Sequence, residues 1–282
     1  MSLPIERTFL RVAAATWFSI AVASECHGHG SFHERVEAIA AELQKRPDDP
    51  QLLLQLAAEN LEHGDWEMTL LHLMRIDTVA PGKLATDLLR GRALAAGGKF
   101  EAAKTKLDAF LAVHPGNAAA LATRARVVSE LGDPQQAAAD GAAALAATSR
   151  PEPDAYGELA DFLTAAGRSA EAVRALDDGI AKLGPLPFFI QRALELELAL
   201  GRADAAVARI DAQVAAAPPA MRPAQMAARA SVLARAGRAD EAHAAWRALR
   251  EYLAALPPLD RASHAMLRLA EQATAALGTS TR

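Results

Sequence analysis

A glycine recurs six times along the chain at almost constant intervals, each time five positions before a small residue. The pairs are Gly64 and Thr69, Gly98 and Ala103, Gly132 and Ala137, Gly167 and Ala172, Gly201 and Ala206, and Gly237 and Ala242. Successive glycines are 34, 34, 35, 34 and 36 residues apart. Glycine can adopt a positive φ and end a helix without a Cβ penalty, and a small side chain lets a second helix pass close by. The spacing therefore predicts a helical hairpin repeated six times.

Three further rows of residues follow the same register. Seven positions before each glycine stand mostly small residues: Ala57, Gly91, Ala125, Ala160, Leu194 and Ala230. Nine positions after it stand Leu73, Leu107, Gly141, Leu176, Ile210 and Trp246, and four before it stand Asn60, Leu94, Val128, Leu163, Glu197 and Leu233. Because Asn60, Gly141 and Glu197 interrupt the apolar rows, we expect looser packing or a shifted register in the first, third and fifth hairpins.

The expected hairpins cover residues 50–79, 84–114, 117–148, 153–183, 187–217 and 223–256. Amphipathic helices over 32–46 and 259–277 are expected to cap the two ends of an array that runs over 47–256, since terminal repeats need a polar outer face. The apolar residues, 51% of the 282, are mostly alanine and leucine, which favour helix. A continuous repeat has no internal domain boundary, so the sequence predicts one array rather than two domains.

The first 23 residues resemble a secretory signal peptide. Arg7 and Arg11 precede an uncharged, mostly apolar run over 12–23, which is too short to span a bilayer. The small residues at its end predict cleavage after Ala23. We therefore expect a periplasmic or secreted protein without stable membrane insertion after the signal is removed. Cys26 lies where a lipoprotein carries its lipid, but Glu25 stands where a small residue is required, which argues against a lipid anchor.

A flexible segment rich in Cys, His and Gly follows the signal over residues 24–31. Cys26, His27, His29 and His33 are the only concentrated set of soft ligands in the chain, and thiolate and imidazole suit Cu(I), Zn or Ni. One alternative function is therefore metal handling through this segment. The other interpretation is a solvated linker, because a short His-rich tract is only a compositional signal.

The residues around the recurring glycines are similar to the tetratricopeptide repeat. In the second hairpin Gly91, Leu94, Gly98, Phe100, Ala103, Leu107 and Pro115 stand where that family has its small, large, aromatic and proline positions, and the period of 34 is the family's own. The resemblance covers 47–256, about three quarters of the chain. It implies an all-α solenoid, a right-handed superhelix whose concave groove binds a protein or peptide.

The resemblance also implies which side chains face the groove. The groove positions precede each glycine by 13, 10, 6, 3 and 2 residues, and the polar candidates for partner binding are Arg92, Arg126, Glu130, Asp161, Gln191, Glu195 and Arg235. Arg92 and Arg126 hold the same position in adjacent repeats, so they could share a carboxylate or an acidic segment. The competing interpretation is that all of these are solvated residues on a groove floor.

Chemistry of other kinds is not indicated. The sequence has no phosphate-binding loop, no His-Glu-x-x-His motif and no Gly-x-Ser-x-Gly motif, so neither an enzyme nor a cofactor is expected. A net charge of −4 argues against nucleic-acid partners. Three functions remain: an exported scaffold for a protein or peptide, which we favour, a metal-handling accessory protein, and an architectural protein that associates with itself.

Overall fold

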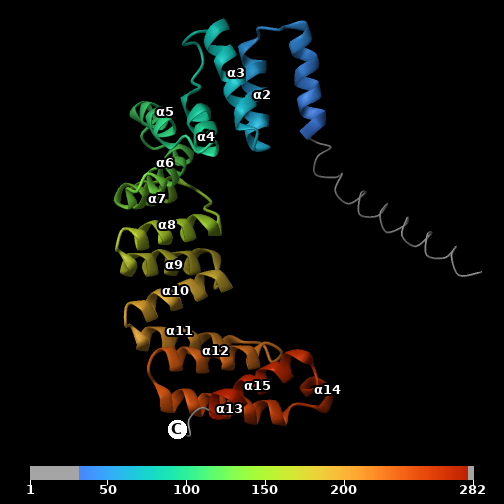
Figure 1. Ribbon diagram of the computed structural model, residues 1–282, viewed down its shortest axis with the longest axis vertical. Coiled ribbons are helices and arrows are strands. Elements are labelled where there is room, and N and C mark those ends of the chain that lie inside the picture. Colours follow the sequence, from blue (N-terminus) through green and yellow to red (C-terminus); the bar gives the residue numbers. More distant parts are fainter. Residues whose placement is uncertain (1–31, 279–282) are drawn as a thin grey trace, which may run out of the picture. The chain divides into compact units, whose positions relative to one another are not determined.

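The computed structural model describes residues 32–278 and contains only helices and connecting turns over that range. A first helix covers 32–45. The others are α2 (Pro50–Glu62), α3 (Trp66–Val79), α4 (Asp87–Ala96), α5 (Phe100–Val113), α6 (Ala118–Glu130), α7 (Pro134–Ala147), α8 (Pro153–Ala165), α9 (Ser169–Leu183), α10 (Pro187–Ala199), α11 (Ala203–Ala216), α12 (Arg222–Arg235), α13 (Ala239–Ala255), α14 (Pro258–Arg261) and α15 (His264–Gly278). The predicted all-α solenoid is confirmed. Successive helices pack on one another from α2 to α6 and from α7 to α13, and α15 packs on α13 (Figure 1).

The helices divide into two compact units, one ending at Asp133 and one beginning at Pro134. Unit 1 contains the helices up to α6, and unit 2 contains α7 to α15. The boundary falls in the turn of the third expected hairpin, where the sequence predicted an uninterrupted array. The repeat spacing could not reveal this boundary. Gly132 has a positive φ like the other turn glycines, so its turn looks the same in the sequence as the turns inside each unit.

All six recurring glycines end a helix in the same way. Their φ angles lie between 67° and 81°. After each glycine, the next residue donates its N–H to the carbonyl five positions back, as Arg168 does to Leu163 at 2.8 Å. The glycine N–H donates to the carbonyl three positions back, as Gly167 does to Thr164 at 3.0 Å. These two bonds form a Schellman motif, which satisfies carbonyls that the helix end would otherwise leave unpaired.

Replacing Gly167 by alanine isolates the energy of this turn. No atom lies within 4 Å of the position a Cβ would take, so the change adds backbone strain without a clash. We expect the free energy of unfolding to fall by about 1–2 kcal/mol, the cost of the left-handed conformation for a residue with a side chain. Urea denaturation followed by far-UV circular dichroism measures it. Gly116→Ala, at another open glycine whose φ is not positive, is the control and should not destabilise.

The predicted small positions face each other inside the hairpins. The Thr69 hydroxyl donates to the carbonyl of Ala57 on the facing helix at 3.1 Å, and both residues are buried. A Cβ on Gly91 would lie 2.8 Å from Leu107 Cγ and 3.6 Å from the Ala103 carbonyl oxygen. Close helix contact is therefore the reason for the small side chains in these two rows.

The interrupted positions are filled rather than loosely packed. The ring of Phe162 lies against Gly141, where an added Cβ would be only 3.0 Å away. Asn60 is buried, with 8% of its surface exposed. Glu197 is buried as well and forms an ion pair with Arg209. Looser packing is not found at Gly141 and Glu197, because an aromatic ring fills the space at the first and a partner charge lies against the second.

Additional helices cover each end of the described chain. The helix over 32–45 packs through Leu43 on α2 and α3, and Arg35 pairs with Glu59 of α2 at 2.9 Å. At the other end, the single helix expected over 259–277 is interrupted by residues 262 and 263. The Ser263 hydroxyl accepts a hydrogen bond from the N–H of Met266 at the start of α15. Met266, Leu269 and Ala273 of this helix pack on the last hairpin.

Candidate functional site

Each unit has a hollow on the side formed mainly by the first helices of its hairpins. The unit 1 hollow has a volume of about 410 Å³ and the unit 2 hollow about 330 Å³. The unit 1 hollow is lined by Leu61, Arg92, Ala95, Ala96, Phe100, Thr123, Arg126, Val127 and Glu130. The unit 2 hollow is lined by Pro187, Ile190, Gln191, Leu194, Glu195, Ile210, Gln213, Gln225, Ala228, Val232 and Arg235.

Arg92, Arg126 and Glu130, three of the expected groove residues, line the unit 1 hollow. Arg92 and Arg126 project from α4 and α6, which come together because first helices recur at one register. Arg92 is already engaged: its Nη2 lies 2.9 Å from Glu62 Oε1, with both side chains at least 40% exposed. An exposed ion pair contributes only about 0–1 kcal/mol, so an incoming carboxylate can compete with Glu62 for Arg92.

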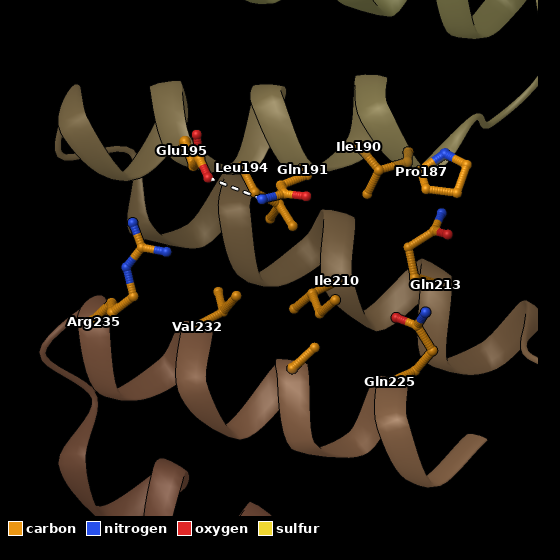
Figure 2. A pocket seen from close by; sticks show the side chains of 11 residues that line it. Pro187, Ile190, Gln191, Leu194, Glu195, Ile210, Gln213, Gln225, Val232 and Arg235 are labelled. Carbon is orange, nitrogen blue, oxygen red and sulfur yellow. Dashed lines mark hydrogen bonds between the residues drawn. The ribbon is translucent and has the colours of Figure 1, made fainter. Parts of the chain in front are cut away.

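Gln191, Glu195 and Arg235, three more expected groove residues, line the unit 2 hollow (Figure 2). Gln191 and Glu195 stand one turn apart on α10, and Gln191 Nε2 donates to Glu195 Oε1 at 3.3 Å. Arg235, at the last turn of α12, lies across the hollow from Glu195 in Figure 2. The repeat register therefore places opposite charges on two walls of one cavity.

Asp161 lines neither hollow. It stands on α8 and forms an ion pair with Arg192 of α10, so it links two successive hairpins of unit 2. A groove position in the repeat register thus carries a structural ion pair here.

Two glutamines of the unit 2 hollow were missed by the sequence reasoning. Gln213 comes from α11, a second helix of a hairpin, whereas the groove positions that the resemblance implies lie on first helices. Gln225 stands 12 residues before its glycine, between two of the expected positions. The fifth hairpin has Leu194 at the position that is small in the other repeats. In the same hairpin, Ile210 and Gln213 of the second helix line the hollow. The large residue at position 194 was therefore the one sequence signal that this hairpin differs from the others.

The proposed metal ligands lie almost entirely outside the described residues. Cys26, His27 and His29 precede residue 32, as does the expected signal peptide. His33 is exposed at the start of the first helix, and its ring centroid lies 5.5 Å from that of Phe32. In the part of the chain that the structure describes, no three His, Cys, Asp or Glu side chains are grouped to hold a metal ion.

The helices over residues 32–278 are all too short or too polar to cross a membrane. The expectation of a cleaved signal and of an exported location rests on residues that precede this range, so it stays a prediction.

Solved structures with the same architecture were found, although the sequence matches no protein-family model and no curated protein. A tetratricopeptide repeat protein from Parabacteroides merdae superimposes with a TM-score of 0.50 at 16% identity, over 90% of this chain and 97% of that one. The C-terminal part of a TPR repeat-containing protein from Cytophaga hutchinsonii gives 0.52 at 12% identity, over 93% and 95%. A chain of the APC/C hetero-tetramer Cut9-Hcn1 gives 0.51 at 15% identity, over 79% of this chain and 42% of that one. Together with the 34-residue register and its Schellman turns, these matches show that the chain has the fold of the tetratricopeptide-repeat proteins.

Proposed function

We propose that the protein is an exported, non-enzymatic scaffold that binds a protein or peptide partner through the hollows of its two units. The observation that supports this most directly is that equivalent first-helix positions bring polar side chains to the rim of an apolar cavity in both units. A cavity with an apolar floor and a few convergent polar groups is the usual form of a binding site.

The size and composition of the hollows favour polypeptide as the ligand. Volumes of about 330 and 410 Å³ are near the lower end of the range for small-molecule sites. Arginine and aliphatic side chains lie side by side in both, which suits a guest that presents polar and apolar groups together. Export is proposed separately, from the apolar run over 12–23 and the small residues at its end.

The test is recovery of a partner by cross-linking to the full-length protein in cell-envelope extract. Reversing two charges with Arg92→Glu and Arg126→Glu is expected to lower the recovery of a unit 1 partner at least about tenfold, because close charge pairs at an interface are strongly coupled. The matched control is Arg46→Glu with Arg75→Glu. It makes the same change in net charge on exposed arginines of unit 1 that do not line the hollow.

If partner recovery falls equally in the control and in the Arg92→Glu, Arg126→Glu variant, the unit 1 hollow is not the binding site. A partner recovered at the wild-type level from this variant and from one with Arg235→Glu would contradict binding through either hollow. Sedimentation of the same variants distinguishes self-association, which would appear as a concentration-dependent increase in mass that the hollow variants lose.

A further inference from the structure

The unit 2 hollow has a floor of aliphatic side chains and polar groups at both ends. Its floor residues are nearly inaccessible to solvent, with Ile210 at 2% exposure, Val232 at 6% and Leu194 at 9%. We infer that this hollow binds an extended peptide segment in which an aliphatic residue and a single acidic residue stand two positions apart. The inference deepens the proposed function and rests on it.

The glutamines at one end are suited to a peptide backbone. In Figure 2, Gln213 of α11 and Gln225 of α12 lie together at the end nearest Pro187. Neither side-chain amide forms a hydrogen bond to any other residue in the range 32–278. A carboxamide offers a donor and an acceptor, as a peptide group does, so two of them can pair with a backbone N–H and C=O. This end of the hollow therefore binds main chain without requiring a particular side chain.

The other end is suited to one carboxylate. Arg235 is exposed and forms no ion pair among the described residues, so its guanidinium can donate hydrogen bonds to an incoming carboxylate without displacing a partner. Glu195 stands on the opposite wall and bonds to Gln191. Its negative charge repels a guest with several acidic residues. One acidic side chain placed on Arg235 is therefore favoured over an acidic run.

The dimensions of α12 determine the spacing of the guest's residues. Gln225 and Arg235 are ten residues apart on one helix, which corresponds to about 15 Å, or roughly four to five residues of extended chain. Val232 precedes Arg235 by one turn, so the aliphatic side chain above Val232 and Ile210 lies next to the acid. In an extended peptide, residues two positions apart point to the same side about 6.6 Å from each other. This geometry gives the pattern aliphatic–x–acidic.

A displayed library of linear eight-residue peptides, with both ends joined to the carrier so that no terminal carboxylate is present, tests the inference on the full-length protein. We expect enrichment of peptides with Ile, Leu or Val two positions from Asp or Glu. Arg235→Glu is expected to change the preferred charged residue from acidic to basic. The control Arg247→Glu, at an exposed arginine of α13 outside the hollow, should keep the wild-type preference.

The proposed contacts of Gln213 and Gln225 with the peptide backbone are tested by a separate pair of substitutions. Gln213→Ala with Gln225→Ala is expected to weaken the selected peptides about tenfold or more while leaving their side-chain preference unchanged, because two hydrogen bonds are lost. Circular dichroism checks that this variant is folded.

The inference is overturned if the library yields no aliphatic–x–acidic pattern, or if Arg235→Glu selects the same peptides as the wild type. Peptides that lose binding with Arg92→Glu and Arg126→Glu but not with Arg235→Glu would place the site in unit 1. That result contradicts this inference but agrees with the proposed function. If the selected peptides bind as expected but no partner is recovered from the envelope extract, the scaffold function fails while the chemistry of the hollow holds.

Discussion

Replacing Arg209 by methionine is expected to lower the free energy of unfolding of unit 2 by about 3–5 kcal/mol, because it leaves a buried carboxylate without a partner. Arg209 of α11 binds Glu197 of α10 with two hydrogen bonds, Nε to Oε2 at 3.0 Å and Nη2 to Oε1 at 2.6 Å. Its Nη1 donates to Asp177 of α9 at 2.8 Å. One guanidinium thus links three successive helices.

Burial decides the size of this effect. Only 15% of the Arg209 side chain and 5% of the Glu197 side chain are exposed, so solvent screens the pair little. Hydrogen bonding to Glu197 raises the pKa of Arg209 above its ordinary value, and the guanidinium stays charged. Without it, the carboxylate of Glu197 is left in a buried site with no opposite charge in contact, which costs free energy.

Two further variants distinguish pairing from packing. The double change Glu197→Leu with Arg209→Met removes both charges and is expected to return the stability to within about 1–2 kcal/mol of the wild type. Arg229→Met breaks the more exposed pair with Asp211 and should cost less than about 1 kcal/mol. Urea denaturation measures all three. A single Arg209→Met change as mild as Arg229→Met would show that the pair is not desolvated.

Ala172→Leu is expected to lower the stability of unit 2 by about 3 kcal/mol, because it overfills the closest contact of the fourth hairpin. Ala172 of α9 and Ala160 of α8 are both fully buried in one core cluster. They hold the two small positions that face each other in the first hairpin, where Thr69 donates to the Ala57 carbonyl. A leucine at position 172 has no space unless the two helices separate.

The control for this change is Ala181→Leu, at an exposed position of the same helix. It adds the same atoms and alters helix propensity equally, so the difference between the two variants measures the contact alone. Thermal unfolding followed by circular dichroism is sufficient. If the two variants unfold at the same temperature, close helix approach is not the reason for the small residue.

Part of the candidate site follows from the repeat register. Arg92 and Arg126 were expected at equivalent positions of adjacent repeats, and they line one hollow. Gln191, Glu195 and Arg235 line another. Asp161 holds an equivalent position but lines neither hollow, and it pairs with Arg192 of the next first helix. Register predicts the face on which a side chain stands, and its neighbours decide whether it is available to a ligand.

The sequence by itself determined the helical hairpins, their turns and the small residues between them, because a positive φ, a helix end and a close contact are local requirements that only a few residue types satisfy. Tertiary structure decided three other features: the division into two units at Asp133, the pairing of Glu197 with Arg209 and Asp177, and the presence of Gln213 and Gln225 in the unit 2 hollow. The physical reason is that these features depend on distances between side chains of different helices, and a period of 34 residues contains no such distances.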